Sequence, residues 1–170
     1  MTKNIVDSTM EGSFTRATRA RINNNLADVS IPTAQLDATT NTVLANVPGL
    51  VTGNLDPGTY YLYASLAGTA TSNGGWKVGL KQGTASMLTT VGLTSTAYTA
   101  SAAAVTHSTS TTDQASLIAA TSAYISAEIE GIVIVGLSGT LQVQFAQNAS
   151  HADTSSLYVD CYFSVTRIGN

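Results

Sequence analysis

The segment from Leu157 to Ile168 constrains the fold of this chain most strongly. Apolar and polar residues alternate along it, so that one face holds Leu157, Val159, Cys161, Phe163 and Val165 and the other holds Tyr158, Asp160, Tyr162, Ser164 and Thr166. An alternation with a period of two is typical of a β-strand that has one face in a core. The second face carries two tyrosines, which favours an exterior that contacts a partner.

The strand pattern extends over residues 38–170. We expect strands over residues 42–47, 50–55, 59–67, 76–81, 87–98, 123–135 and 141–145. Turn signals such as Asp56-Pro57-Gly58 and Asn73-Gly74-Gly75 separate these segments. Residues 99–116 are a low-complexity run of Ser, Thr and Ala and are predicted to form a long loop with weak extended structure. The sequence therefore predicts an all-β, antiparallel sandwich over residues 38–170.

Residues 1–37 follow a different pattern and are predicted to form an arm and a linker. The segment Ser8-Thr9-Met10-Glu11 matches a helix capping box, and an apolar stripe follows it at four-residue steps. We predict a helix over residues 8–27, and an extended arm that orders only on a partner is the alternative. The arm is basic, because it holds four of the seven Lys and Arg residues, namely Lys3, Arg16, Arg19 and Arg21.

Charge is sparse in the chain as a whole. Charged residues make up 10% of the sequence, against about 25% in typical soluble domains. The net charge of −3 does not favour binding to nucleic acid or to an anionic membrane, and no apolar run approaches the roughly 20 residues of a membrane-spanning helix. The N-terminus lacks the apolar core of a secretory signal, which predicts synthesis and folding in a cytoplasm. The single cysteine, Cys161, is expected to be a buried thiol.

Motifs for catalysis or for metal binding are not evident. His107 and His151 lie in Ser- and Thr-rich segments, without metal-ligand spacing. Glu128 and Glu130 are two residues apart and could act as a catalytic carboxylate pair, although a solvated strand face is the favoured interpretation. Trp76 could stack on a sugar, but its alternation with Val78 and Leu80 favours a core position. We therefore expect neither an enzyme nor a bound cofactor.

Two stretches of the sequence resemble a known fold family. They are NVPGLVTGNLDPGTYYLYASLAGT and GTLQVQFAQNASHADTSSLYVDCYFSVTRI. They resemble the early aromatic strand and the last hairpin of jelly rolls of the complement and tumour-necrosis-factor family. With the Ala-, Thr- and Gly-rich sequence between them, they are also similar to small structural proteins of tailed bacteriophages. The resemblance covers about residues 40–168 and implies a jelly roll of eight to ten strands, a homotrimer and a place in a virion.

These observations together predict a capsid decoration, or cement, protein that trimerises on the outside of a phage head. The trimer interface is expected to involve four outward tyrosines, Tyr61, Tyr63, Tyr158 and Tyr162; the alternative is that these tyrosines are scattered over the surface or lie under a loop. The arm is expected to bind the major capsid protein through Phe14, Arg16, Arg19, Arg21, Ile22 and Leu26, the arginines pairing with acidic side chains. The alternative function is the tip of a tail fibre or baseplate, with the 99–116 loop binding a host-surface glycan.

Overall fold

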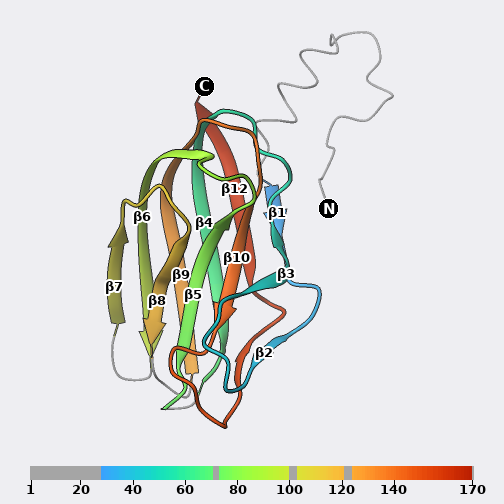
Figure 1. Ribbon diagram of the computed structural model, residues 1–170, viewed down its shortest axis with the longest axis vertical. Helices are drawn as coiled ribbons and strands as arrows, with labels where there is room; N and C mark the ends of the chain where they lie inside the picture. The colour runs from blue at the N-terminus through green and yellow to red at the C-terminus, as the bar shows by residue number, and fades with distance from the viewer. Residues whose placement is uncertain (1–27, 71–72, 100–102, 121–123, 170) are drawn as a thin grey trace.

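The chain folds into two stacked β-sheets (Figure 1). The structure is a computed structural model, and it describes residues 28–70, 73–99, 103–120 and 124–169. These residues form twelve β-strands and no helix, and every strand pairing is antiparallel. The prediction of an all-β, antiparallel protein is therefore confirmed, while the helix predicted over residues 8–27 lies outside the described residues.

The larger sheet has eight strands. Six of them lie in the order β1-β12-β4-β9-β6-β7, and β11 pairs with both β2 and β4. Figure 1 shows β7 and β1 at the two lateral edges of this sheet. The bounds are β1 (Asp28–Ser30), β2 (Leu36–Ala38), β4 (Gly58–Thr69), β6 (Leu88–Thr99), β7 (Ala103–Ser108), β9 (Tyr124–Val135), β11 (Ser155–Leu157) and β12 (Tyr162–Gly169).

The smaller sheet has four strands in the order β3-β10-β5-β8. Their bounds are β3 (Ala45–Val51), β5 (Trp76–Gln82), β8 (Gln114–Ala120) and β10 (Leu141–Ala146). The core lies between the two sheets. Trp76 and Phe145 come from the smaller sheet and meet edge to face, with ring centroids 5.6 Å apart, and Phe163 comes from the larger sheet. Trp76 is fully buried and donates its Nε1–H to the Thr69 carbonyl, so its predicted core position is confirmed.

The strand predicted over Leu157–Ile168 is divided in two. Leu157 pairs with Gly68 and Tyr162 pairs with Ser65. The four residues 158–161 between these pairs therefore lie opposite only two residues of β4, 66 and 67. The two extra residues leave the ladder as a bulge, and Val159 becomes 54% exposed instead of entering the core. Because the insertion is even in number, the alternation resumes in phase and Cys161 is buried, as predicted.

Strand pairing begins earlier in the chain than expected. The sequence pattern predicts a linker over residues 28–37, but β1 pairs with β12 over Asp28–Ser30, and β2 pairs with β11. Each of these strands has three residues, which is too short for alternation to be visible in a sequence. Residues 28–30 and 36–38 therefore belong to the sandwich.

The prediction of a long loop with only weak extended structure over residues 99–116 is wrong, because regular strands lie within this range. Residues 103–108 form β7, which pairs with the edge of β6, and β8 begins at Gln114 and pairs with β5. A run of Ala, Thr and Ser has no clear apolar face, so its sequence does not reveal a strand. The ladder along β6 supplies backbone partners that such a segment can use whatever its side chains are.

Candidate interaction face

The outer face of the larger sheet collects aromatic and acidic side chains. On β4, Tyr60, Leu62 and Ala64 are buried in the core, so that Tyr61 and Tyr63 stand on the opposite side. The neighbouring strands add further outward residues by the same alternation. We call this surface the tyrosine–glutamate face, and it consists of Tyr61, Tyr63, Tyr98, Glu128, Glu130, Ile132 and Tyr162.

The tyrosine hydroxyls and the two carboxylates of this face are hydrogen bonded to one another across strands. The Tyr61 hydroxyl donates to Oε2 of Glu130 at 3.0 Å, and the Tyr63 hydroxyl donates to Oε1 of Glu128, also at 3.0 Å. From the other side, the Tyr98 hydroxyl lies 3.5 Å from Oε2 of Glu128. Each tyrosine bonds a glutamate diagonally across the ladder, since Tyr63 pairs directly with Glu130 and Tyr61 with Ile132.

This network changes the acidity of two tyrosines. The pKa of Tyr61 is raised, first because its hydroxyl donates to the Glu130 carboxylate. The pKa of Tyr63 is raised more strongly, first by its hydrogen bond with the Tyr162 hydroxyl, then by desolvation and by Glu128. The rings of Tyr63 and Tyr162 are in contact, with centroids 5.5 Å apart and planes tilted by 41°. The tyrosines of the face are thus connected to one another and to the two carboxylates.

Much of this layer remains open to contact. Tyr61, Ile132 and Tyr162 are each more than a third exposed, and Tyr98 is 43% exposed. Val105 on β7 pairs with Thr96 and extends the apolar strip, being 57% exposed. A contiguous exposed strip of aromatic and aliphatic groups is typical of an interaction surface. In the smaller sheet, by contrast, the half-buried or exposed positions of β5 and β10 are polar: Lys77, Lys81, Gln142 and Gln144.

The structure brings together three of the four tyrosines predicted for the interface. Tyr61, Tyr63 and Tyr162 share the face, while Tyr158 lies in the bulge after β11 and is half-buried away from it. Tyr98 also belongs to the face, and Glu128 and Glu130 bond to its tyrosines, and neither feature was predicted from the sequence. Alternation alone could place each of them outward, but not side by side, because they lie on different strands.

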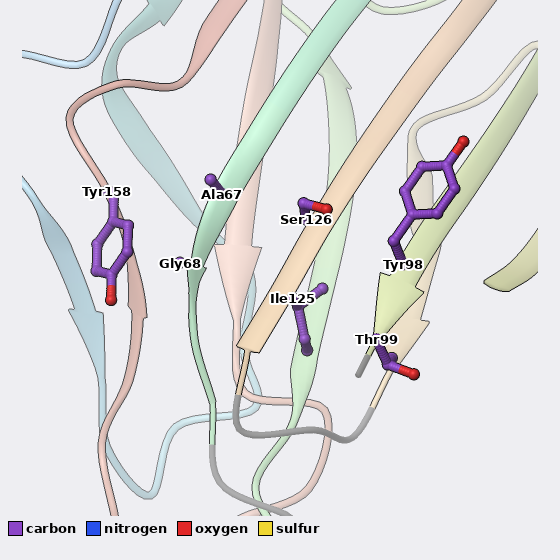
Figure 2. A pocket seen from close by; sticks show the side chains of 7 residues that line it. All are labelled: Ala67, Gly68, Tyr98, Thr99, Ile125, Ser126 and Tyr158. Carbon is purple, nitrogen blue, oxygen red and sulfur yellow. The ribbon is translucent and has the colours of Figure 1, made fainter. Parts of the chain in front are cut away.

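Tyr158 instead borders a groove at one end of the sheet. Figure 2 shows Tyr158 and Tyr98 on opposite sides of β4 and β9, with Ala67, Gly68 and Ser126 between them. The groove has a volume of about 380 Å³ and its lining is mostly apolar. Gly68, one of the residues that line the groove, cannot be replaced without strain, because a β-carbon there would lie 2.0 Å from the Ser156 carbonyl oxygen.

Other predicted groups have ordinary structural roles or lie elsewhere. The arm residues Phe14, Arg16, Arg19, Arg21, Ile22 and Leu26 are outside the described residues. His107 Nδ1 lies 3.1 Å from the Thr94 hydroxyl, and His151 Nδ1 lies 3.2 Å from an Asp153 carboxylate oxygen. Within the described ranges, no three His, Cys, Asp or Glu side chains come close enough to hold a metal ion. In the same residues, no helix has the length and apolar character needed to cross a membrane.

Comparison with known proteins does not identify a family for this chain, so its function is inferred from its own residues. Neither a scan against protein-family models nor a search of curated proteins found a match to this chain.

Proposed function

We propose that the sandwich is a jelly roll, and its strand pairing supports this. Eight strands form four nested antiparallel pairs along the chain: β1 with β12, β3 with β10, β4 with β9, and β5 with β8. Successive pairs alternate between the larger and the smaller sheet. A long antiparallel ribbon wrapped around a core produces this order. The β6–β7 hairpin is then an insertion between β5 and β8 that widens the larger sheet beside β9.

The function we propose is that of a virion structural protein: a capsid decoration protein that forms a homotrimer on the outside of a phage head. The observation that carries this proposal is the tyrosine–glutamate face, whose rigid rings offer contact area at a low cost in side-chain entropy. A ring of three copies requires a heterologous contact, in which this face meets a different surface of the next copy. No enzymatic activity is part of the proposal, since the two carboxylates are engaged by tyrosine hydroxyls on an open sheet.

Attachment to the head is assigned to the N-terminal segment. Phe14, Ile22 and Leu26 would fill an apolar groove of the major capsid protein, and the three arginines would pair with its acidic side chains. Three segments on one trimer act together through their effective concentration, so that modest single contacts give firm binding. Binding that favours the assembled shell would raise its stability.

Sedimentation of the full chain at micromolar concentration tests the trimer. We expect a trimer for the unmodified chain and a shift toward monomer for the double variant Tyr61→Ser/Tyr162→Ser. The matched control is Val43→Ser, which removes a side chain that is 73% exposed at a site away from the face. A monomeric unmodified chain, or equal trimer content in the double variant, would remove the basis of the proposal.

Binding to purified, emptied heads tests the location. The unmodified chain is expected to coat the heads, and the variant Phe14→Ser/Ile22→Ser/Leu26→Ser is expected to remain trimeric without coating them. Full coating by that variant would contradict the role of the arm.

A second candidate function is a receptor-binding tip module, and the groove between Tyr98 and Tyr158 favours it. Aromatic walls around a floor of small residues suit the apolar face of a sugar ring. Staining of host cells by labelled protein, abolished by Tyr98→Ser/Tyr158→Ser, would support this candidate. Staining of heads alone would support decoration.

A further inference from the structure

The tyrosine–glutamate face is anionic, while most of the basic residues of the chain lie in its N-terminal segment. Glu128 and Glu130 are the carboxylates on the face, and the imidazole of His107 lies beside Thr94, which pairs with Glu130. The Lys and Arg side chains among the described residues are Lys77 and Lys81 on β5 of the other sheet and Arg167, which lies over the ring of the buried Tyr60. The face therefore has unbalanced negative charge beside exposed apolar groups.

The N-terminal segment joins this same sheet close to the carboxylates. Asp28 pairs with Val165 on β12, Val165 pairs with Leu62 on β4, and Leu62 pairs with Gly131 on β9. The chain thus enters the sheet in the row next to Glu130, three strand spacings or about 14 Å away. An extended segment from Arg21 to Asp28 spans about 23 Å, so its basic residues are within reach of both glutamates.

We infer that residues 14–26 dock on the tyrosine–glutamate face of the same chain. Arg19 and Arg21 would pair with Glu128 and Glu130, and Ile22 would contact the exposed tyrosine rings. The segment combines positive charge with apolar side chains, the two features that complement this face. Because exposed ion pairs are individually weak and are screened by salt, the docked segment can be released.

This inference rests on the proposed role of the face as a protein interface, and it adds control of that interface. A docked segment competes with other copies for the face, so it weakens the trimer without abolishing it at micromolar concentration. Capsid carboxylates would compete with Glu128 and Glu130 for the same arginines. Attachment to a head would then remove the competition at the face and strengthen the trimer there.

Paramagnetic relaxation in the full chain tests the contact. A nitroxide label is attached to the cysteine of the variant Ala20→Cys. Cys161 is 1% exposed and is not expected to take up the label, and treating the unmodified chain with the same reagent is the control for this. The docked fraction is expected to make the backbone amides of Glu128 and Glu130 lose intensity, while those of Lys77 and Gln142 on the other sheet are expected to keep it. Glu128→Gln/Glu130→Gln removes the charges, keeps oxygen acceptors for the tyrosines, and is expected to restore the lost intensity.

Charge exchange makes the test specific. Arg19→Glu/Arg21→Glu should abolish the intensity loss, and combining it with Glu128→Lys/Glu130→Lys should bring the loss back. Docking within one chain would be overturned if the intensity loss arises only between a nitroxide-labelled chain and a separate isotope-labelled chain. It would also be overturned if the amides of the other sheet lose intensity, or if no amide does. Docking without any trimer would refute the proposed function alone, while a trimer that decorates heads without this intensity loss would refute the docking alone.

Discussion

Gly131 allows strands β9 and β6 to approach each other closely within the larger sheet, and replacing it with alanine should be severely destabilising. It lies between Glu130 and Ile132 on β9 and has φ of +150°, a backbone conformation that residues with a β-carbon rarely adopt. A β-carbon there would lie 2.0 Å from the Gly92 carbonyl oxygen and 2.9 Å from the Leu93 α-carbon on β6. The clash is with backbone, so a change of side-chain rotamer cannot relieve it.

The cost of Gly131→Ala has two parts. The backbone conformation contributes about 1–3 kcal/mol. Moving β6 away from β9 weakens one or two ladder hydrogen bonds, each worth about 1 kcal/mol. The free energy of unfolding should therefore fall by about 2–5 kcal/mol, and the middle of that range corresponds to a loss of roughly 10 °C in Tm for a chain of this size.

Gly92 provides the matched control for this prediction. It lies opposite Ile132 on the adjacent strand, and a β-carbon there would meet nothing closer than 3.9 Å. Gly92→Ala should therefore change stability by less than about 0.5 kcal/mol. Urea unfolding followed by the fluorescence of the single tryptophan, Trp76, measures both variants. Neutral sites typically change the free energy of unfolding by less than about 0.5 kcal/mol. If the free energies of unfolding of Gly131→Ala and Gly92→Ala differ by less than about that amount, the argument from the close approach of the two backbones is refuted.

Three further predictions concern the core and the titrating groups. Phe163→Ala, at a fully buried position, should cost about 3–5 kcal/mol in urea unfolding, whereas Ile168→Ala, at a position 56% exposed, should cost less than about 0.5 kcal/mol; similar costs would contradict the assigned core. Cys161 should not react with a disulfide reagent at neutral pH until the chain unfolds, because burial limits access and raises the pKa of the thiol; rapid reaction of the native protein would disprove this. Tyr61 should stay protonated above pH 10, because its pKa is raised by the Glu130 carboxylate. A raised pKa means that the folded state holds the proton more tightly, so its contribution to stability is complete below pH 10, the ordinary value, and is lost as the pH rises through the folded pKa. Near-ultraviolet tyrosinate absorbance of Glu130→Gln should show one tyrosine ionising at lower pH than in the unmodified chain, and an unchanged titration would contradict the bond.

The alternation of apolar residues was sufficient to predict the long strands of this protein. It located β4, β5, β9 and β10 to within a few residues, because each of them buries one face and a period of two is a local property. It failed for β7, whose small polar residues have no distinct apolar face, and at Val159, where a bulge interrupts the ladder. Both features depend on the neighbouring strand and not on the segment itself.

The candidate face was only partly visible in the sequence. Alternation showed that Tyr61, Tyr63 and Tyr162 point away from the core, and the same alternation put Glu128 and Glu130 outward. Which of them are neighbours depends on pairings between segments far apart in the chain, since Tyr61 and Glu130 are separated by 69 residues and Tyr63 and Glu128 by 65. Side-chain direction follows from local geometry, whereas strand order and register are set by the burial of the whole core. The sequence by itself thus determined which residues face outward, and only the tertiary structure joined them into one hydrogen-bonded surface.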